Sequence, residues 1–415
     1  MHWLALLRGN PAFCRLWSSQ CISSIGDWFN HIAIINMVIG LTGSGLSVAV
    51  AITCRTIPLI LIGPWLGARI DRSDKKQLLI GADVLRALLA SGYLLVDKAG
   101  DLWIVYLLSA CLGLCTVAFD AARMAYLPQV VAAEKLITAN SIFSFSFGGT
   151  VAFGALTGGW IVSMTGNNSA FLFNAATFAV SGLLLSGIQA AEPARHKQHR
   201  RLWTRELGAA LQWLAHNRLV LLVLLTDAGL AVCSGIMNVL LGVFALQVFM
   251  AGSFGLGILY LALGLGFIAG SLGARKFSCI SGRQSQTVMS WLFVSIGAAV
   301  IAFSQCLNLA AAAGSLLALY LLQAIFGILY NTVLMLLIPA GLQGKLFALD
   351  KIKLAVIMSI SALLAGGLLE ITAPRLLGLA TGSLTVGCGL ACLVIGKFNQ
   401  ADTGERIKQD GDLSA

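Results

Sequence analysis

The sequence predicts an all-α membrane protein with twelve transmembrane helices in two pseudo-symmetric six-helix bundles. Three observations predict this fold: the mean hydropathy is +0.88, only 11% of the 415 residues are charged, and long apolar runs recur along the chain. Soluble domains carry about 25% charged residues, so this chain cannot cover a water-facing surface and belongs in a bilayer. The runs are continuous and do not alternate, which excludes a transmembrane β-barrel.

The positions of the twelve spans follow from apolar runs bounded by charged residues or by Gly, Asn and Pro. The predicted spans are residues 13–41, 46–69, 77–96, 102–125, 136–164, 169–189, 217–249, 254–275, 286–306, 310–338, 347–371 and 376–397. Asn10 and Pro11 form a good N-cap and N1 pair. We therefore expect the first long helix to begin at this pair.

The Lys and Arg residues set the orientation of the chain. With the N-terminus in the cytoplasm, only Lys98 and Arg375 of the 27 Lys and Arg residues fall on the opposite face, and Arg55 and Arg86 lie inside spans. The remaining 23 lie at cytoplasmic ends, as the positive-inside rule requires. The net charge of +10 is thus a topology signal and not a sign of nucleic-acid binding. We predict a multi-pass protein of the bacterial inner membrane with both termini in the cytoplasm.

A long polar stretch, residues 190–216, divides the chain into an N-terminal bundle (1–189) and a C-terminal bundle (217–397). It begins with a basic run and continues into an amphipathic segment, which we interpret as a cytoplasmic linker with an interfacial helix. A flexible linker is an equally good interpretation of its first twelve residues. Residues 398–415 are polar, so we expect a disordered cytoplasmic tail.

The loop after the second span reads Gly67-Ala-Arg-Ile-Asp71-Arg72-Ser-Asp-Lys75-Lys76 and resembles motif A of the major facilitator superfamily, G-x-x-x-D-R-x-G-R-R. The turn glycine of that motif is missing, because Ser73 and Asp74 stand at the two positions that read x-G in the motif. The resemblance implies two six-helix repeats that rock about a central site. It also implies that this loop latches the cytoplasmic side when the protein faces outward. Arg123, near the cytoplasmic end of the fourth span, is expected to reach Asp71 and complete the latch.

Neighbouring segments narrow the resemblance to the branch of macrolide efflux proteins and the enterobactin exporter. They are residues 82–88, 120–128 and 139–141. Asp83 and Arg86 belong to this pattern, and their i,i+3 spacing favours mutual neutralisation and a structural role. The resemblance implies transport of a small molecule out of the cell.

The fifth span contains Gly154-Ala155-Leu-Thr-Gly158-Gly159, which resembles the antiporter motif G-P-x-x-G-G of exporters. Ala155 replaces the proline, which removes an element that promotes a kink. The three glycines allow tight packing against a neighbouring helix. Glycine-rich packing without any meaning for transport direction is the alternative interpretation.

Charged and polar residues inside the spans mark a candidate site, since they are costly in a bilayer. Asp27, Asn30 and His31 share one face of the first span, Arg55 lies near the middle of the second, and Asp227 is the only acid in the seventh. Asp27 and His31 can exchange a proton while Arg55 or Asp227 binds or gates the substrate. A static Asp27–Arg55 pair that joins two helices is the other interpretation.

These features predict a proton-coupled exporter of a small amphipathic molecule, either a drug such as a macrolide or a siderophore. We expect a monomer in the lipid bilayer that needs no metal and no cofactor, with the proton gradient as its driving force. Seven of the 10 cysteines lie in apolar runs and the chain has no C-x-x-C motif, which favours packing over metal binding. An importer with the same fold is the nearest alternative. An intramembrane enzyme lacks a supporting motif, and a membrane receptor without transport activity is the last alternative.

Overall fold

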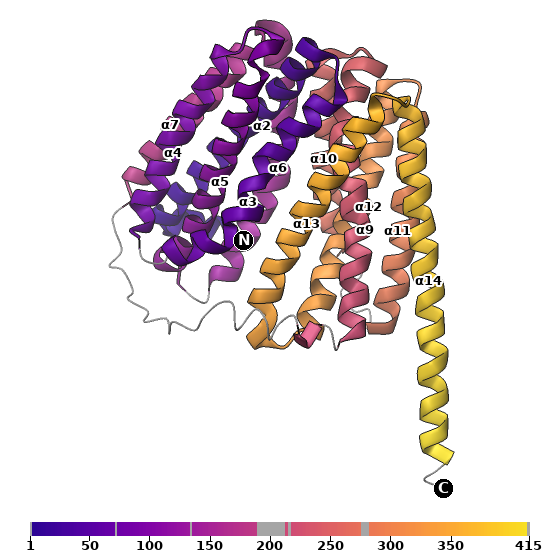
Figure 1. Ribbon diagram of the computed structural model, residues 1–415. Helices are drawn as coiled ribbons and strands as arrows, with labels where there is room; N and C mark the ends of the chain where they lie inside the picture. The colour runs from indigo at the N-terminus through magenta and orange to yellow at the C-terminus, as the bar shows by residue number, and fades with distance from the viewer. Residues whose placement is uncertain are drawn as a thin grey trace.

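The computed structural model describes residues 2–70, 73–132, 135–188, 212–214, 217–274 and 282–412. Within these ranges the regular structure is helical throughout and contains no strand. Figure 1 shows long, roughly parallel helices in two groups, the first from indigo to magenta and the second from pink to yellow. The predicted all-α class is therefore confirmed.

Each predicted span falls on one long helix. The first half contains the short α1 (His2–Gly9), then α2 (Pro11–Thr42), α3 (Gly45–Ile70), α4 (Lys75–Gly92), α5 (Leu102–Val130), α6 (Leu136–Thr165) and α7 (Asn167–Ser186). The second half contains α9 (Arg218–Val243) with its π-helical extension η4 (Phe244–Val248), α10 (Gly252–Gly273), α11 (Gly282–Gln305), α12 (Leu309–Leu337), α13 (Ala340–Leu369) and α14 (Pro374–Asp412). Two 3₁₀ turns, Tyr93–Leu95 and Ala99–Asp101, connect α4 to α5.

Eleven of these helices are long and apolar enough to cross a membrane. The other long helix, α2, carries Asp27, Asn30, His31 and Asn36, whose polarity lowers its mean hydropathy. Its start is the predicted one: Asn10 Oδ1 accepts a hydrogen bond from the backbone N–H of Phe13 at 2.9 Å, and Pro11 follows at N1. A long helix with several polar residues thus crosses the middle of the first half.

The two halves repeat one pattern of helix contacts. In the first half, α2 packs on α6 and α7, α3 packs on α5, and α4 packs on α5 and α7. In the second half, α9 packs on α13 and α14, α10 packs on α12, and α11 packs on α12 and α14. Each contact thus has a counterpart six helices later, as two related bundles require. Between the halves, α6 packs on α10 and α3 packs on α13.

The structure corrects the prediction of a disordered tail for residues 398–412, while residues 413–415 lie outside the described residues. Helix α14 continues to Asp412 and extends beyond the rest of the bundle (Figure 1). A helix that has already formed gains a hydrogen bond with every added residue, and this segment contains no proline and several good helix formers. The predicted linker at 190–216 lies outside the described residues, except for a helical stretch at 212–214 and Asn217 beside it.

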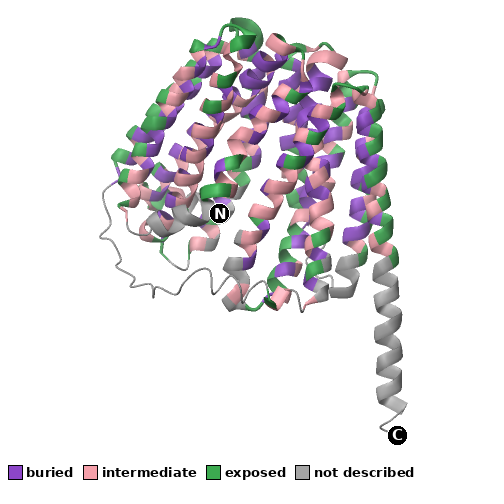
Figure 2. Cartoon of the chain, in the orientation of Figure 1, coloured by how far each residue is buried: buried purple, intermediate pink, exposed green. Residues whose placement is uncertain are grey.

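The hydrophobic cores show where the two halves meet. We call the end of the bundle that carries Lys75, Lys76 and Lys135 the basic end. The largest core contains residues of both halves, such as Val38 of α2 and Leu241 of α9, and lies away from the basic end. Two smaller cores near the basic end each belong to one half. Buried residues accordingly gather in the upper centre of Figure 2.

Polar contacts also close the end opposite the basic end. Ser44 Oγ donates to Glu370 Oε1 at 2.6 Å, and Gln247 Nε2 donates to the carbonyl of Gly43 at 2.8 Å. Both contacts join the first half to the second. The described residues therefore form a bundle that is sealed at this end and whose halves have separate cores at the basic end.

Candidate functional site

A charged pair lies in a cavity between α2 and α3. Arg55 Nη2 contacts Asp27 Oδ1 at 2.5 Å, and the two side chains are 25% and 21% exposed. The cavity has a volume of about 280 Å³ and is lined by Ser24, Asp27, Trp28, His31, Ile52, Arg55, Thr56 and Phe147. The sequence predicted Asp27 and Arg55 as candidate site residues. The structure places them in contact in a cavity that has both apolar and polar lining residues.

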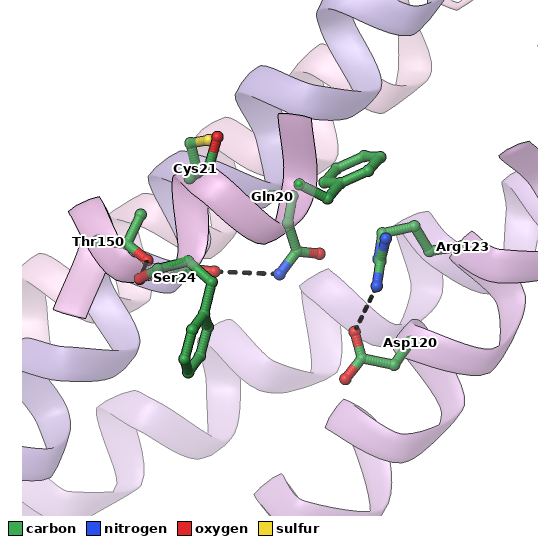
Figure 3. Close-up of a pocket in the computed structure, with 9 residues that line it drawn as sticks. Gln20, Cys21, Ser24, Asp120, Arg123 and Thr150 are labelled. Carbon is green, nitrogen blue, oxygen red and sulfur yellow. Dashed lines mark hydrogen bonds and ion pairs between the residues drawn. The ribbon is translucent and has the colours of Figure 1, made fainter. Parts of the chain in front are cut away.

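A second cavity adjoins the first toward the basic end. Its volume is about 440 Å³, and it is lined by Gln20, Cys21, Ser24, Asp120, Arg123, Phe143, Ser146, Phe147 and Thr150 (Figure 3). The two cavities share Ser24 and Phe147. Arg123 and Asp120 thus lie between the basic end and the Asp27–Arg55 pair.

His31 connects this cavity to the other half. Its Nε2 lies 2.9 Å from the hydroxyl of Tyr260 on α10, and Trp28 packs against both rings. Tyr260 is buried and was not singled out from the sequence, because an aromatic residue in an apolar run gives no sign of its partner. The cluster of Trp28, His31 and Tyr260 forms a wall between the cavity and the sealed end.

Replacing Tyr260 by Phe tests this wall. The variant loses one hydrogen bond, which contributes about 0.5–1.5 kcal/mol. We therefore expect the sealed end to open several-fold more often, seen as faster hydrogen exchange in η4 and at the start of α10. Tyr106→Phe on α5 is the control, and equal exchange in the two variants would contradict a closing role for the His31–Tyr260 bond.

Asn30 does not line either cavity. It is fully buried, and Gly26, one turn earlier on the same face, lies against Asn174 and Thr177 of α7. The face of α2 with Gly26 and Asn30 is thus turned toward α7, while Asp27 and His31 face the cavity. The sequence could not separate these directions, because all three polar residues lie within little more than one turn.

Asp227 does not join the Asp27–Arg55 pair. Its Oδ2 accepts a hydrogen bond from Lys353 Nζ at 3.0 Å, and Lys353 also contacts Asp350 Oδ1 at 2.7 Å. The hydroxyl of Tyr330 donates to the same Asp350 oxygen at 2.7 Å. These four residues form a separate C-half cluster on α9, α12 and α13. Lys353 is one of the 23 Lys and Arg residues that were predicted to lie at cytoplasmic ends. Helix α13 begins at Ala340 and not near 347, which places Lys353 well inside the helix.

Asp83 and Arg86 form a buried ion pair with little access to any cavity. Arg86 Nη2 contacts Asp83 Oδ1, Ser181 Oγ donates to Asp83 Oδ2 at 2.7 Å, and the guanidinium lies between the rings of Phe119 and Phe178. The Arg86 and Asp83 side chains are 2% and 0% exposed. These contacts favour the structural role that the sequence predicted.

Replacing Arg86 by Met is expected to destabilise the fold, because it leaves the Asp83 carboxylate buried without its cation. Breaking a buried pair costs about 3–5 kcal/mol. The melting temperature in detergent should fall clearly, and the double variant Asp83→Asn/Arg86→Met should recover most of the loss. A single variant as stable as the wild type would contradict the structural role.

The predicted cytoplasmic latch is described only in part. Gly67 lies in the last turn of α3, while Asp71 and Arg72 lie outside the described residues. Lys75 begins α4, and Lys76 Nζ donates to the carbonyls of Ser186 and Ile188 at 2.8 and 2.6 Å, which joins α4 to the end of α7. Arg123 Nη2 lies 3.6 Å from Asp120 Oδ1, and its guanidinium stacks on Phe143. The contact between Arg123 and Asp71 stays a prediction.

The three glycines of α6 lie at close helix contacts. A Cβ on Gly154 would lie 3.1 Å from Trp28 Cβ, and one on Gly158 would lie 3.0 Å from Phe29 Cα, so both glycines pack α6 on α2. A Cβ on Gly159 would lie 2.5 Å from the carbonyl oxygen of Ser253, so Gly159 packs α6 on α10 of the other half. The predicted tight packing is present at all three positions.

Comparison with known proteins identifies relatives of this chain. An uncharacterized MFS-type transporter, YfiS of Bacillus subtilis, is 26% identical over 53% of this chain and 53% of its own length. Macrolide efflux protein A of Streptococcus pyogenes is 29% identical over 30% of this chain and 31% of its own length. The putative bacilysin exporter BacE of Bacillus amyloliquefaciens is 26% identical over 45% and 46% of the two chains. The matches thus span about half or less of these relatives. They confirm the predicted resemblance to efflux proteins.

Solved structures with the same fold cover nearly the whole chain. A mutant form of the nucleoside transporter NupG superposes with a TM-score of 0.73 at 13% identity and covers 92% of this chain and 99% of its own. A bacterial homologue of the iron transporter ferroportin, in an inward-facing state, gives 0.70 at 15% identity and covers 93% and 97%. The family model described as Major Facilitator Superfamily matches residues 16–350. With the paired six-helix contacts and the spans described above, this match shows that the chain belongs to the major facilitator superfamily of membrane transporters.

Proposed function

We propose that this transporter is a proton-coupled exporter of small amphipathic molecules in the bacterial inner membrane, with its basic end in the cytoplasm. The observation that supports it best is the position of the Asp27–Arg55 pair. The pair lies in a cavity that continues through Ser24 and Phe147 into a larger cavity toward the basic end. The opposite end is sealed by contacts between the halves. This arrangement suits a transporter that loads its substrate from the cytoplasm.

The lining of the two cavities suits an amphipathic substrate. Phe143, Phe147 and Trp28 offer apolar surfaces, and Arg55 and Asp27 offer one charge of each sign. A basic substrate group that contacts Asp27 competes with a proton for the same carboxylate. Substrate and proton thus bind in alternation at Asp27, which is the requirement for antiport. His31 lines the same cavity as the pair, and its Nε2 lies 2.9 Å from the Tyr260 hydroxyl.

Export, and not import, is favoured by the named relatives. Macrolide efflux protein A and the bacilysin exporter BacE are both named for outward transport. The distribution of Lys and Arg along the chain supports assigning the open, basic end to the cytoplasm. A macrolide or bacilysin is therefore our first substrate class, and a siderophore is the second. We propose that the transporter works as a monomer in the lipid bilayer, without a metal or a cofactor.

Uptake into inverted membrane vesicles tests this proposal. Vesicles with an acidic interior should accumulate at least one of three radiolabelled probes, erythromycin, bacilysin or enterobactin, and collapse of the pH gradient should stop the accumulation. Vesicles from cells without the protein are the control. Uptake of a probe by right-side-out vesicles with an acidic exterior, and none by inverted vesicles, would identify an importer and overturn the proposed direction.

A further inference from the structure

The C-half cluster occupies the place in the second bundle that the larger cavity occupies in the first. That cavity lies among α2, α5 and α6, and the cluster lies among α9, α12 and α13, which are the corresponding helices six positions later. In the first half this place is open, with Gln20 and Arg123 at its wall (Figure 3). In the second half it is filled by Lys353 and its partners.

Lys353 Nζ has three oxygen atoms close to it. It donates hydrogen bonds to Asp227 Oδ2 and to the carbonyl of Leu224, both at 3.0 Å, and forms an ion pair with Asp350 Oδ1 at 2.7 Å. These partners leave little of the ammonium group for a substrate. The acceptors come from both α9 and α13, and Lys353 therefore joins the two helices.

The charges of the cluster do not balance. Two carboxylates, Asp227 and Asp350, share one ammonium, and the third partner, Tyr330, is neutral and donates its hydrogen bond to Asp350. Among the described residues, Lys353, Asp350 and Tyr330 are the groups that act on Asp227. Asp227 and Asp350 are only 13% and 6% exposed. A net negative charge at such a place in a membrane protein is costly, and one bound proton removes it.

We infer that the C-half cluster is a proton-binding site, in which Asp227 and Asp350 share a single proton, and that it is distinct from the Asp27–Arg55 pair in the first half. The Asp27–Arg55 pair carries no net charge that a bound proton would remove. The C-half cluster thus offers a proton site that is occupied without substrate, in addition to the proton exchange proposed for Asp27.

Water access can couple this site to transport. Lys353 is 24% exposed in the present conformation, in which the basic end is open. Helix α13 packs on α3 of the first half, with Ser359 Oγ 2.7 Å from Thr56 Oγ1. When the halves close at the basic end, α13 moves toward the first half and the cluster loses water, which favours the neutral, protonated form. The coupling step rests on the proposed proton-driven export, but the binding of a proton does not.

Infrared spectroscopy of the purified protein tests the proton site without a substrate. Protonated carboxylic acids have a carbonyl stretch that is separate from the carboxylate bands. The wild type should show a carbonyl band whose intensity falls as the pH is raised. This pH-dependent loss of intensity, which we call the infrared step, should be absent in both Asp227→Asn and Asp350→Asn. Lys353→Met removes the cation of the cluster, so both carboxyls should take up protons and the band should grow. Asp27→Asn and Asp120→Asn are controls that should keep the step.

A band that persists unchanged in both Asn variants would overturn the inference. If one of these variants does not reach the membrane, the other makes the same prediction, since either Asn leaves a neutral Lys–Asp pair. In vesicles, Asp227→Asn should still exchange erythromycin across the membrane but should lose at least tenfold of its gradient-driven accumulation. A wild type without any erythromycin, bacilysin or enterobactin transport but with the infrared step would refute the proposed export and leave the proton site standing.

Discussion

Replacement of Arg55 by Ala is expected to lower the export rate about ten- to hundredfold. The Arg55 guanidinium contacts Asp27 in the cavity, and it is the cation that a substrate anion or dipole meets there. Hydrogen bonds to charged groups contribute about 1.5–3 kcal/mol, which corresponds to a change of roughly that size. The measurement is the initial rate of probe uptake into inverted vesicles, corrected for the amount of protein. Arg375→Ala, at the sealed end, is the control and should retain transport.

The double variant Asp27→Asn/Arg55→Gln decides between the two interpretations of the pair. It keeps a polar side chain at each position and removes both charges. If the pair only joins α2 to α3, this variant should recover both stability and transport. If the pair binds substrate and proton, stability should recover and transport should not. We expect the second result, because the pair is partly exposed to the cavity and its neighbours Trp28 and His31 line the same space.

Replacement of Gly264 by Ala is the second change with a large expected effect. A Cβ at this position of α10 would lie 2.6 Å from the backbone nitrogen of Ala152 on α6 and 2.8 Å from its Cα. Backbone atoms cannot move aside as a flexible side chain can, so the two helices must separate. Overpacking of this kind costs about 1–3 kcal/mol. Helices α6 and α10 join the two halves, so the variant should separate the halves along this contact and favour the outward-open state.

Hydrogen exchange and transport together measure this shift. The amides of η4 and of the start of α10 should exchange at least several-fold faster in Gly264→Ala than in the wild type, and export should slow because the inward-open state is populated less. Gly149→Ala on α6 is the matched control, since a Cβ there meets no atom within 4 Å. Equal exchange rates in the two alanine variants would show that the α6–α10 contact does not control the sealed end.

The fold could be predicted almost completely from the sequence, because a bilayer leaves few solutions for long apolar runs. Each of the twelve predicted spans falls on one helix, and the start at Asn10 and Pro11 has the expected cap. The start of α13 at the basic end was predicted too late. Its first turns are polar, so hydropathy assigns them to a loop, although the helix begins at Ala340.

The candidate site could be predicted in part. The Asp27–Arg55 pair follows from two charges in neighbouring apolar helices, and the structure places them in contact. Partners from distant helices could not be found in this way. Tyr260 lies 229 residues from His31 along the chain, and Lys353 lies 126 residues from Asp227. Spacing along one helix shows which residues share a face, but only the packing of the two halves shows what that face meets.

The direction of proton movement during transport tests the central claim most directly. The purified protein is reconstituted in liposomes that contain a pH-sensitive dye, and a gradient of erythromycin, bacilysin or enterobactin is imposed without a pH gradient. We predict that entry of the transported probe into the lumen drives protons outward, so the lumen becomes alkaline, and that Asp27→Asn abolishes this signal. Acidification of the lumen, or probe movement without any pH change, would contradict proton-coupled export.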